Sequence, residues 1–166
     1  RSFDVEPEFV RSVSDRLATL ARAQDALLES PDDRVSMRSI VEANLGHLSP
    51  VDVTGDDATV PGRSAPYVAL ALHELGTNAL KSGALSHDDG RVELHWHEDQ
   101  ARDIHIVWKE HSPIPAKSTA KEGFGTALLT RIFTAATNGR VQRELTPSGL
   151  QWSAMLPTAP ELLADN

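Results

Sequence analysis

The sequence contains no cysteine, and this absence removes several chemistries at once. A chain without thiols forms no disulfides, binds no metal through thiolates and has no cysteine nucleophile. The composition is compatible with a reducing compartment but does not require one. Several enzyme classes are therefore excluded before any motif is considered.

Positive charge and long apolar runs are also scarce. The formal net charge is −8 and no basic run of five residues occurs, whereas a nucleic-acid surface needs Lys and Arg to replace released counterions. No apolar stretch approaches the ~20 residues that span a bilayer, and no signal peptide precedes Arg1. We expect no nucleic-acid partner and no direct membrane contact. The missing initiating Met suggests a fragment of a longer protein. We expect the fragment to be cytoplasmic, and the intact protein could be soluble or membrane-anchored.

The chain length of 166 residues suits one ordinary domain with an appendage, and such a chain buries roughly 70% of its unfolded surface. Asp4 is a candidate cap for a first helix, and Pro7 is tolerated in its first turn. The segment ESPDDR ends this helix, which we interpret as part of a separate hairpin. Its side chains recur at three- and four-residue spacing along one seam: Phe9, Val13, Leu17, Leu20, Gln24 and Leu27.

The remaining pattern mixes helices with antiparallel strands. We predict a helix over 35–48, a short strand within 51–60, a helix after Pro66 and a β-hairpin over 90–110. A long loop follows over 111–126, and loops of that length are usually functional or mobile. A helix over 126–138, ended by Gly139 as its C′ residue, precedes two strands across Pro-Ser-Gly. The sequence predicts an α+β fold with helices on one face of a sheet. Inward positions of the 35–48 helix are Met37, Ile40, Val41, Leu45 and Leu48.

The segment LALHELGTNALKSGALS, residues 70–86, combines an apolar stripe with a polar one. Val68, Leu72, Leu75 and Ala79 fall within about 60° of one another on a helical wheel. The polar stripe lies on the opposite side of the helix and contains Glu74, Asn78 and Lys81. Apolar residues flank this stripe, so it could line a pocket. An ordinary surface helix with a solvated stripe is the alternative that spacing leaves open.

The Gly-Phe-Gly-Thr turn at 123–126 is a candidate anion site. Glycine lets the backbone approach an anion closely, and the first N–H groups of a helix carry partial positive charge. An Asn one turn beyond a Glu, as in Asn78 and Glu74, could hold Mg²⁺ beside phosphates. Together these features favour a metal-nucleotide pocket, although Gly-Phe-Gly is also common as a plain hinge.

Three histidines on neighbouring strands raise the possibility of a zinc site. His95 and His97 share one strand face, and His105 lies on the partner strand. No carboxylate at a fixed ligand spacing completes the set, and alternating polar residues are typical of the solvated face of a sheet. No G-x-S-x-G motif supports a hydrolase.

Three segments in order, ALHELGTNALKSGALS, VWKE and GFGTALL, resemble sensor histidine kinases of the HWE group. The signature residues of that group correspond to His73, Trp108 and Glu110, and the similarity extends over about Phe9 to Pro157. The resemblance implies the Bergerat-type ATP-binding fold of the GHKL superfamily, a mixed, mostly antiparallel sheet layered against helices. ATP would lie between the Asn-bearing helix and a flexible lid.

The resemblance also implies roles for individual residues, with ATP and Mg²⁺ as cofactors. Asn78 would bind Mg²⁺ and phosphate, Glu74 would orient water or metal as a catalytic residue, and Lys81 would approach phosphate. Glu110 would accept a hydrogen bond from the adenine amino group. The other implied nucleotide-binding residues are His73, Trp108, Gly123, Phe124, Gly125 and Thr126, of which the glycines and Thr126 would close on the phosphates.

The chain departs from the family pattern at two places. His111-Ser112-Pro113 stands where the family usually has a glycine pair, and Ser82 stands where an aromatic residue often follows the Lys. Proline removes a donor and fixes φ, so the base of the lid cannot take glycine conformations.

By resemblance, the chain is the ATP-binding catalytic portion of a sensor histidine kinase. It would transfer the γ-phosphoryl group to a histidine outside this fragment, and thence to the receiver domain of a response regulator. Residues 1–30 would be the second helix of a truncated dimerisation and phosphotransfer hairpin that makes the intact protein a homodimer. Residues 31–160 would be the catalytic domain, and 161–166 a tail. No equivalent phosphoacceptor His precedes Phe9, so the fragment should not autophosphorylate in the usual way.

Two alternatives remain. The first is a degenerate, non-catalytic or phosphatase-type signalling module of the same fold that acts on a response regulator. The second is a generic ATPase or anti-sigma-type protein kinase, which the HWE signature makes less favoured.

Overall fold

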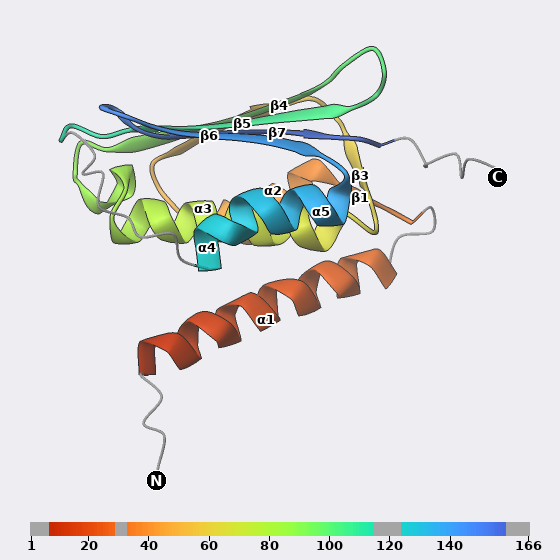
Figure 1. Cartoon of the computed structure of the whole chain (residues 1–166), viewed down its shortest axis with the longest axis horizontal. Helices are drawn as coiled ribbons and strands as arrows, with labels where there is room; N and C mark the ends of the chain where they lie inside the picture. The colour runs from red at the N-terminus through yellow and green to blue at the C-terminus, as the bar shows by residue number, and fades with distance from the viewer. Residues whose placement is uncertain (1–6, 29–32, 115–123, 159–166) are drawn as a thin grey trace, which may run out of the picture.

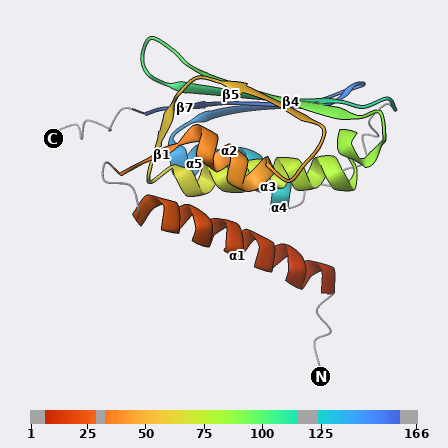
Figure 2. The ribbon, with the colours of Figure 1, turned by 180° about the vertical axis from the view of Figure 1, so that it is seen from behind.

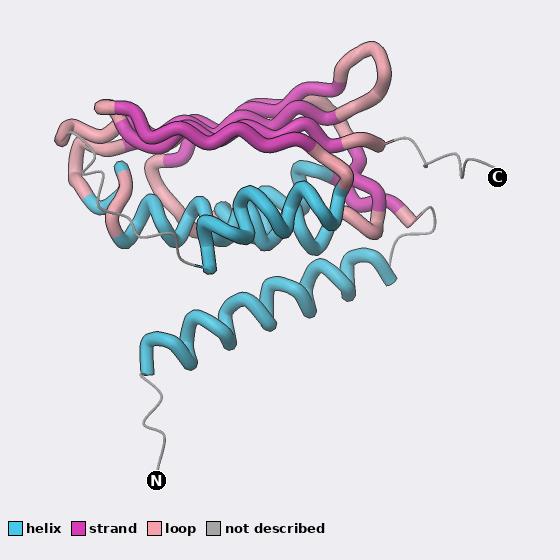
Figure 3. Tube along the Cα trace, viewed as in Figure 1, coloured by secondary structure: helices cyan, strands magenta, loops and turns pink. Residues whose placement is uncertain are grey.

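A computed structural model describes residues 7–28, 33–114 and 124–158. The molecule has three layers: a β-sheet, a layer of helices on one of its faces, and helix α1 outside that layer (Figures 1 and 3). Seen from behind, the helices again lie on one side of the sheet (Figure 2). The predicted α+β class, with a mostly antiparallel sheet against helices, is confirmed. None of the helices within the described ranges is both long and apolar enough to cross a membrane.

The main sheet has five strands in the order β2-β4-β5-β7-β6. Strand β2 pairs in parallel with β4, whereas every other neighbouring pair is antiparallel. The predicted hairpin is therefore β4 and β5, and the predicted last two strands are β6 and β7. The bounds are β2 Val51–Gly55, β4 Arg91–Glu98, β5 Ile104–His111, β6 Arg140–Thr146 and β7 Gly149–Leu156.

The short strand expected within 51–60 is in fact two strands in different sheets. One is β2, at the edge of the main sheet. The other is β3 (Thr59–Pro61), which pairs antiparallel with β1 (Arg34–Ser36) in a separate two-stranded sheet. Strand β1 is too short to produce a detectable period-two pattern, which is why the sequence did not indicate it.

Residues of β4 and β5 alternate between the core and the open face of the sheet. Trp96 and Trp108 are fully buried, whereas His95 and His97 are exposed. The rings of His97 and His105 stack with centroids 4.9 Å apart, and those of His95 and His97 at 5.6 Å. Within the described ranges no group of three or more His, Cys, Asp or Glu residues could hold a metal ion. The histidines are a stacked row on the open face, and the zinc hypothesis finds no support.

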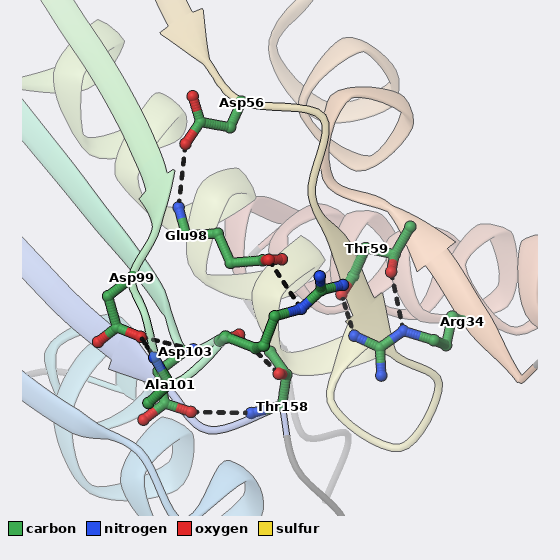
Figure 4. Close-up of polar contacts among 9 residues, drawn as sticks. Arg34, Asp56, Thr59, Glu98, Asp99, Ala101, Asp103 and Thr158 are labelled. Atoms are coloured by element: carbon green, nitrogen blue, oxygen red, sulfur yellow. Dashed lines mark hydrogen bonds and ion pairs between the residues drawn. The ribbon is translucent and has the colours of Figure 1, made fainter.

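The turn between β4 and β5 is held by the carboxylate of Asp99. It accepts hydrogen bonds from the backbone N–H groups of Ala101 (2.9 Å) and Asp103 (3.0 Å), as Figure 4 shows. A side-chain hydrogen bond with His105 lowers the pKa of Asp99. The Asp103 carboxylate in turn accepts from the N–H of Thr158 at 3.3 Å. The predicted Asp-Gln-Ala-Arg turn is thus confirmed, with Arg102 in the left-handed region at φ 71°.

Two helices cover the centre of the sheet: α2 (Met37–Leu45) and α3 (Ala65–Lys81). The Ser36 hydroxyl accepts from the N–H of Ser39 and caps α2. The predicted inward positions of α2 are correct, since Met37, Ile40, Val41 and Leu45 are buried and Leu48 packs against the core. A 3₁₀ turn, η1 (Ala84–Ser86), follows α3.

The helix predicted over 126–138 is a continuous helical run with a π segment in its middle. It consists of α4 (Phe124–Ala127), the π segment η2 (Leu128–Ile132) and α5 (Phe133–Thr137). The carbonyl of Leu129 accepts a 2.8 Å hydrogen bond from the indole N–H of Trp152, so a side chain enters the helix ladder there.

The prediction of Gly139 as the helix-ending residue was wrong by one position. Asn138 takes the left-handed conformation at φ 54°, a role that asparagine tolerates well. Gly139 is needed for a different reason: a Cβ there would lie 2.6 Å from the carbonyl oxygen of Met155.

Helix α1 (Pro7–Leu28) lies across the helical layer, on the side away from the sheet (Figures 1 and 2). Within the predicted seam, Val13 and Leu17 are 37% and 61% exposed, and the neighbouring Val10 is 50% exposed, so this part of the seam does not face the domain. The side chains of Phe9 and Leu27 lie outside the described ones. The buried side chains of α1 are instead Thr19 and Ala23, and Leu20 is half-buried. One face of α1 contacts the domain, and a second, apolar face is open.

Candidate functional site

Helix α3 supplies the centre of the candidate site. Its predicted apolar stripe is buried, with Leu72, Leu75 and Ala79 at 1% exposure or less. The opposite stripe is not an ordinary solvated surface, because Glu74 is only 3% exposed and Asn78 is half-buried. Helix α3 lies between the sheet and α1, so both of its faces are covered. Glu74 is thus covered by α1 and not by solvent, and the interpretation of the polar stripe as a pocket wall stays a prediction.

Glu74 is neutralised by Arg16 of helix α1. The two side chains form a bidentate pair, with Nε to Oε1 at 2.6 Å and Nη2 to Oε2 at 2.9 Å. The Glu74 side chain is 5% exposed and that of Arg16 is 21% exposed. Guanidinium and carboxylate groups match geometrically in such a fork, which gives strong charge-assisted hydrogen bonds. The sequence analysis missed Arg16 entirely.

The start of the 124–137 helical run lies directly against Glu74 and Asn78. A Cβ at Gly125 would meet Oε2 of Glu74 at 2.6 Å and Nδ2 of Asn78 at 4.0 Å. The glycine therefore permits a close approach that a side chain would block. Thr126 is half-buried beside it. Gly123 lies outside the described residues, and only the backbone of Phe124 is described, so the predicted Gly-Phe-Gly-Thr anion site is seen only in part.

Glu110 lies in a second buried polar cluster at the end of β5. It is 3% exposed, Oε2 accepts from the N–H of Ala84 at 2.9 Å, and Oε1 accepts from the indole N–H of Trp108 at 3.3 Å. Burial raises the pKa of Glu110, and these hydrogen bonds oppose the rise. Trp108 is itself fully buried, so its indole positions Glu110 from within the core. Glu110 thereby ties the turn after α3 to the sheet.

His73 and Lys81 occupy the margins of α3. His73 is half-buried, and burial lowers its pKa, whereas the charges of Glu74 and Asp15 oppose the change. The charges of Asp15, Arg16 and Arg22, which also influence the pKa of His73, all belong to α1. Lys81 is exposed in the last turn of α3.

The residues directly after Glu110 are held by hydrogen bonds. The N–H of Ser112 donates a 2.7 Å hydrogen bond to the carbonyl of Ser148 in the turn between β6 and β7. The Ser112 hydroxyl also donates to the carbonyl of Ile114 at 2.8 Å. The first residues of the predicted loop are thus fixed to the sheet. Residues 115–123, most of the expected lid, lie outside the described ranges.

The predicted residues therefore fall into two places joined by α3 and the turn that follows it. Glu74, Asn78 and Gly125 form one cluster, and Glu110 with Trp108 forms the other. Carboxylate and carboxamide oxygens beside an open glycine backbone suit a hard cation and a phosphate, since Mg²⁺ prefers oxygen ligands. The donor set of the first cluster fits a magnesium-nucleotide ligand. Nothing in the spacing of Arg16 indicated that it would complete this cluster, because it lies 58 positions from Glu74.

The known proteins that resemble this chain in sequence or in structure are histidine kinases. No protein-family model matches the chain. Blue-light-activated histidine kinase 1 of Erythrobacter litoralis (strain HTCC2594) is 33% identical over 163 residues, which cover 90% of this chain and 44% of that protein. The chain thus spans less than half the length of this curated relative.

Solved structures share the fold. The Erythrobacter litoralis EL346 blue-light activated histidine kinase superposes with a TM-score of 0.69 at 16% identity, covering 92% of this chain and 56% of that one. The histidine kinase ThkA, in complex with the response regulator protein TrrA, superposes with a TM-score of 0.59 at 11% identity, covering 98% and 54%. At these identities the likeness concerns the fold alone.

Proposed function

Because the chain belongs to the HWE-group histidine kinases and has the fold of their GHKL-type catalytic domains, we propose that it is the ATP-binding catalytic portion of a sensor histidine kinase. It transfers the γ-phosphoryl group of ATP to a histidine outside these residues. The phosphoryl group then passes to the receiver domain of a response regulator. Residues 31–160 are the catalytic domain in this proposal.

The observation that carries the proposal is the position of Gly125 against Glu74 and Asn78. In the sequence, a hairpin and a long loop separate Glu74 and Asn78 from Gly125. In the structure they are so close that a Cβ placed on Gly125 would lie 2.6 Å from Oε2 of Glu74. Only a glycine allows so close an approach, which brings the start of the 124–137 helical run, with its partly positive backbone N–H groups, against the polar stripe of α3.

The residues of this cluster divide the work of phosphoryl transfer. Asn78 offers an amide oxygen to Mg²⁺ and phosphate, Lys81 adds positive charge, and Gly125 and Thr126 offer backbone N–H groups. Mg²⁺, when bound, neutralises charge on the phosphates. Glu74 orients water or metal at the same place. Phosphoryl transfer needs mainly positioning and charge neutralisation, which such a set of residues supplies.

At the other end of the pocket we assign Glu110 to the adenine amino group. Each carboxylate oxygen carries two lone pairs, so the hydrogen bonds from Ala84 and Trp108 leave acceptor capacity. His73 and Trp108 support the site indirectly, through α1 and through Glu110.

Helix α1 supports the assignment of residues 1–30 to a dimerisation and phosphotransfer hairpin. Val10, Val13 and Leu17 follow one another at helical spacing and remain exposed. Such an apolar stripe is typical of a helix that lacks its partner helices. In the intact protein we expect those partners to be the preceding hairpin helix and a second subunit.

The experiment that tests the proposal is calorimetric titration of the chain with a non-hydrolysable ATP analogue, with and without Mg²⁺. We expect binding that depends on Mg²⁺. A folded chain that binds neither analogue nor ATP at millimolar concentration would refute the proposal.

A second candidate function has its own observation. Ser112 and Pro113 replace glycines, and the Ser112–Ser148 hydrogen bond fixes the base of the lid. A fixed base favours a degenerate or phosphatase-type signalling module that acts on a response regulator. Binding of a receiver domain without any nucleotide binding would support this alternative.

A further inference from the structure

Few of the described side chains of α1 are fully buried against the rest of the molecule. Along the described side chains of α1, burial is limited to Thr19 and Ala23, both small. Small side chains remove little apolar surface from water, so they contribute little to the attachment of a helix. The bidentate pair of Arg16 with Glu74 is correspondingly prominent at this contact.

The packing beneath α1 is also imperfect. A cavity of about 50 Å³ lies between α1, α2 and α3. Nearby, Oδ1 of Asn44 is buried without a hydrogen-bond partner, while its Nδ2 donates to the carbonyl of Ile40 at 2.8 Å. A void and an unsatisfied acceptor both cost free energy in the attached arrangement. Residues that line the cavity include Thr19, Arg22, Ala23, Ile40, Asn44 and Ala69.

Glu74, with which Arg16 of α1 pairs, belongs to the candidate site. Oε2 of Glu74 accepts from Arg16 and is also the atom nearest to a Cβ placed on Gly125. A carboxylate engaged by a guanidinium has its charge compensated and its lone pairs in use. It therefore attracts a second cation, such as Mg²⁺, less strongly than a free carboxylate does.

We propose that Arg16 is an autoinhibitory latch: with α1 attached, its guanidinium compensates the charge of Glu74 and weakens the attraction of this carboxylate for metal, and detachment of α1 releases the carboxylate. This inference rests on the proposed function, because it assumes that the cluster around Glu74 binds Mg²⁺ and a nucleoside triphosphate. A signal that moves α1 would then control the affinity of the catalytic domain for nucleotide.

Coupling of this kind is reciprocal. If the attached helix weakens nucleotide binding, then nucleotide must weaken the attachment of the helix by the same factor. The latch therefore predicts effects in both directions, and a purely structural ion pair predicts neither.

The test uses the full chain and three variants, Arg16→Ala, Arg16→Lys and Arg11→Ala. Arg11→Ala is the matched control, since Arg11 is an exposed arginine of the same helix. Circular dichroism first confirms that each variant is folded. Arg16→Lys keeps the charge without the fork geometry and replaces Arg16→Ala if that variant does not fold. Affinity for a non-hydrolysable ATP analogue with Mg²⁺ is measured by calorimetry, and amide hydrogen exchange of α1 by mass spectrometry.

We expect Arg16→Ala to bind the analogue about tenfold more tightly than the parent, because removing the latch raises the fraction of competent molecules. Arg16→Lys should fall between them, and Arg11→Ala should equal the parent. Saturating nucleotide should speed amide exchange of α1 in the parent, whereas α1 of Arg16→Ala should exchange fast at the outset.

The outcomes separate the two proposals. If the parent binds nucleotide, and Arg16→Ala binds it equally or less tightly with unchanged exchange of α1, the latch is refuted and the proposed function stands. If Arg16→Ala binds and the parent does not, the latch is supported in its strongest form. If no folded variant binds nucleotide, the proposed function fails and the latch falls with it.

Discussion

Glu74 and Glu110 are equally buried, at 3% exposure, but their charges are compensated in different ways. Glu74 is paired with an arginine from α1, whose fully buried side chains within the described set are the small Thr19 and Ala23. Glu110 is held by a backbone N–H and an indole N–H that belong to the core of the domain itself. In our proposal the first compensation is exchanged for another cation, whereas the second comes from groups of the catalytic domain itself.

From this difference we infer different roles for the two glutamate side chains. A carboxylate with a removable partner is suited to metal and phosphate chemistry, because its charge becomes available when the partner leaves. A carboxylate fixed by dipoles is suited to recognition and to holding the turn after α3. The predictions below test that contrast, from the largest expected effect to the smallest.

The largest contrast should appear in stability. Glu110→Ala leaves the N–H groups of Ala84 and Trp108 buried without an acceptor and opens a void, so we expect a loss of about 2–4 kcal/mol in the free energy of unfolding. Glu74→Ala leaves Arg16, which is 21% exposed and can turn its head group to water, so about 1 kcal/mol is expected. Urea unfolding followed by fluorescence of the buried tryptophans measures both. Equal losses would contradict the distinction between the two glutamates.

Nucleotide binding should depend on the Glu74 cluster through Asn78. Asn78→Ala removes the carboxamide without entering the core stripe, so the chain should stay folded. We expect affinity for a magnesium-nucleotide to fall about 10- to 100-fold, the range for one lost charge-assisted hydrogen bond. Calorimetry measures this loss. Gln142→Ala, which removes a carboxamide from the exposed edge strand β6, is the control and should leave affinity unchanged.

Base selectivity should depend on Glu110. If its carboxylate accepts the adenine amino group, ATP should be preferred over GTP by roughly tenfold or more, because guanine presents a carbonyl acceptor to a desolvated carboxylate. Glu110→Gln should narrow the preference, since a carboxamide can offer a donor to guanine. Competition between the two nucleotides for the folded chain measures the ratio. An unchanged preference in Glu110→Gln would remove the adenine assignment and leave Glu110 a purely structural role.

The smallest effect concerns pH. Burial raises the pKa of Glu110, so the folded chain holds this proton at higher pH than the unfolded chain does. The resulting stabilisation is present below the unfolded pKa and is lost as pH rises through the folded pKa. We measure the unfolding free energies of the parent and of Glu110→Gln across that pH window. As pH rises, the parent should lose stability relative to Glu110→Gln, which has no carboxyl group to titrate at this position. A flat difference would mean that burial leaves the proton affinity of Glu110 unchanged on folding.

Much of the fold could be predicted because its elements carry strong local patterns. The hairpin of β4 and β5 alternates over eight residues in each strand, and α3 carries an apolar stripe over four turns. Elements with weak local patterns were not predicted correctly. Strands β1 and β3 have only three residues each. The end of the last helix depended on which residue takes the left-handed conformation, and this residue is Asn138.

The candidate site shows the same division. Residue chemistry brought Glu74, Asn78 and the Gly125 turn into one hypothesis, and the order of the motifs, which HWE-group kinases share, supported it. The same reasoning placed Trp108 in the nucleotide pocket, while the structure shows it fully buried behind Glu110.

The sequence by itself determined the period of each long element, and with it which side chains share a face, since the 3.6- and 2-residue periods are properties of the backbone. Only the tertiary structure decided which faces meet. Arg16 reaches Glu74 across 58 positions, and Ala84 reaches Glu110 across 26, because the paths of the connecting segments bring α1 and the turn after α3 to those carboxylates. Local spacing carries no record of such distant contacts, and they give the two buried glutamates their different partners.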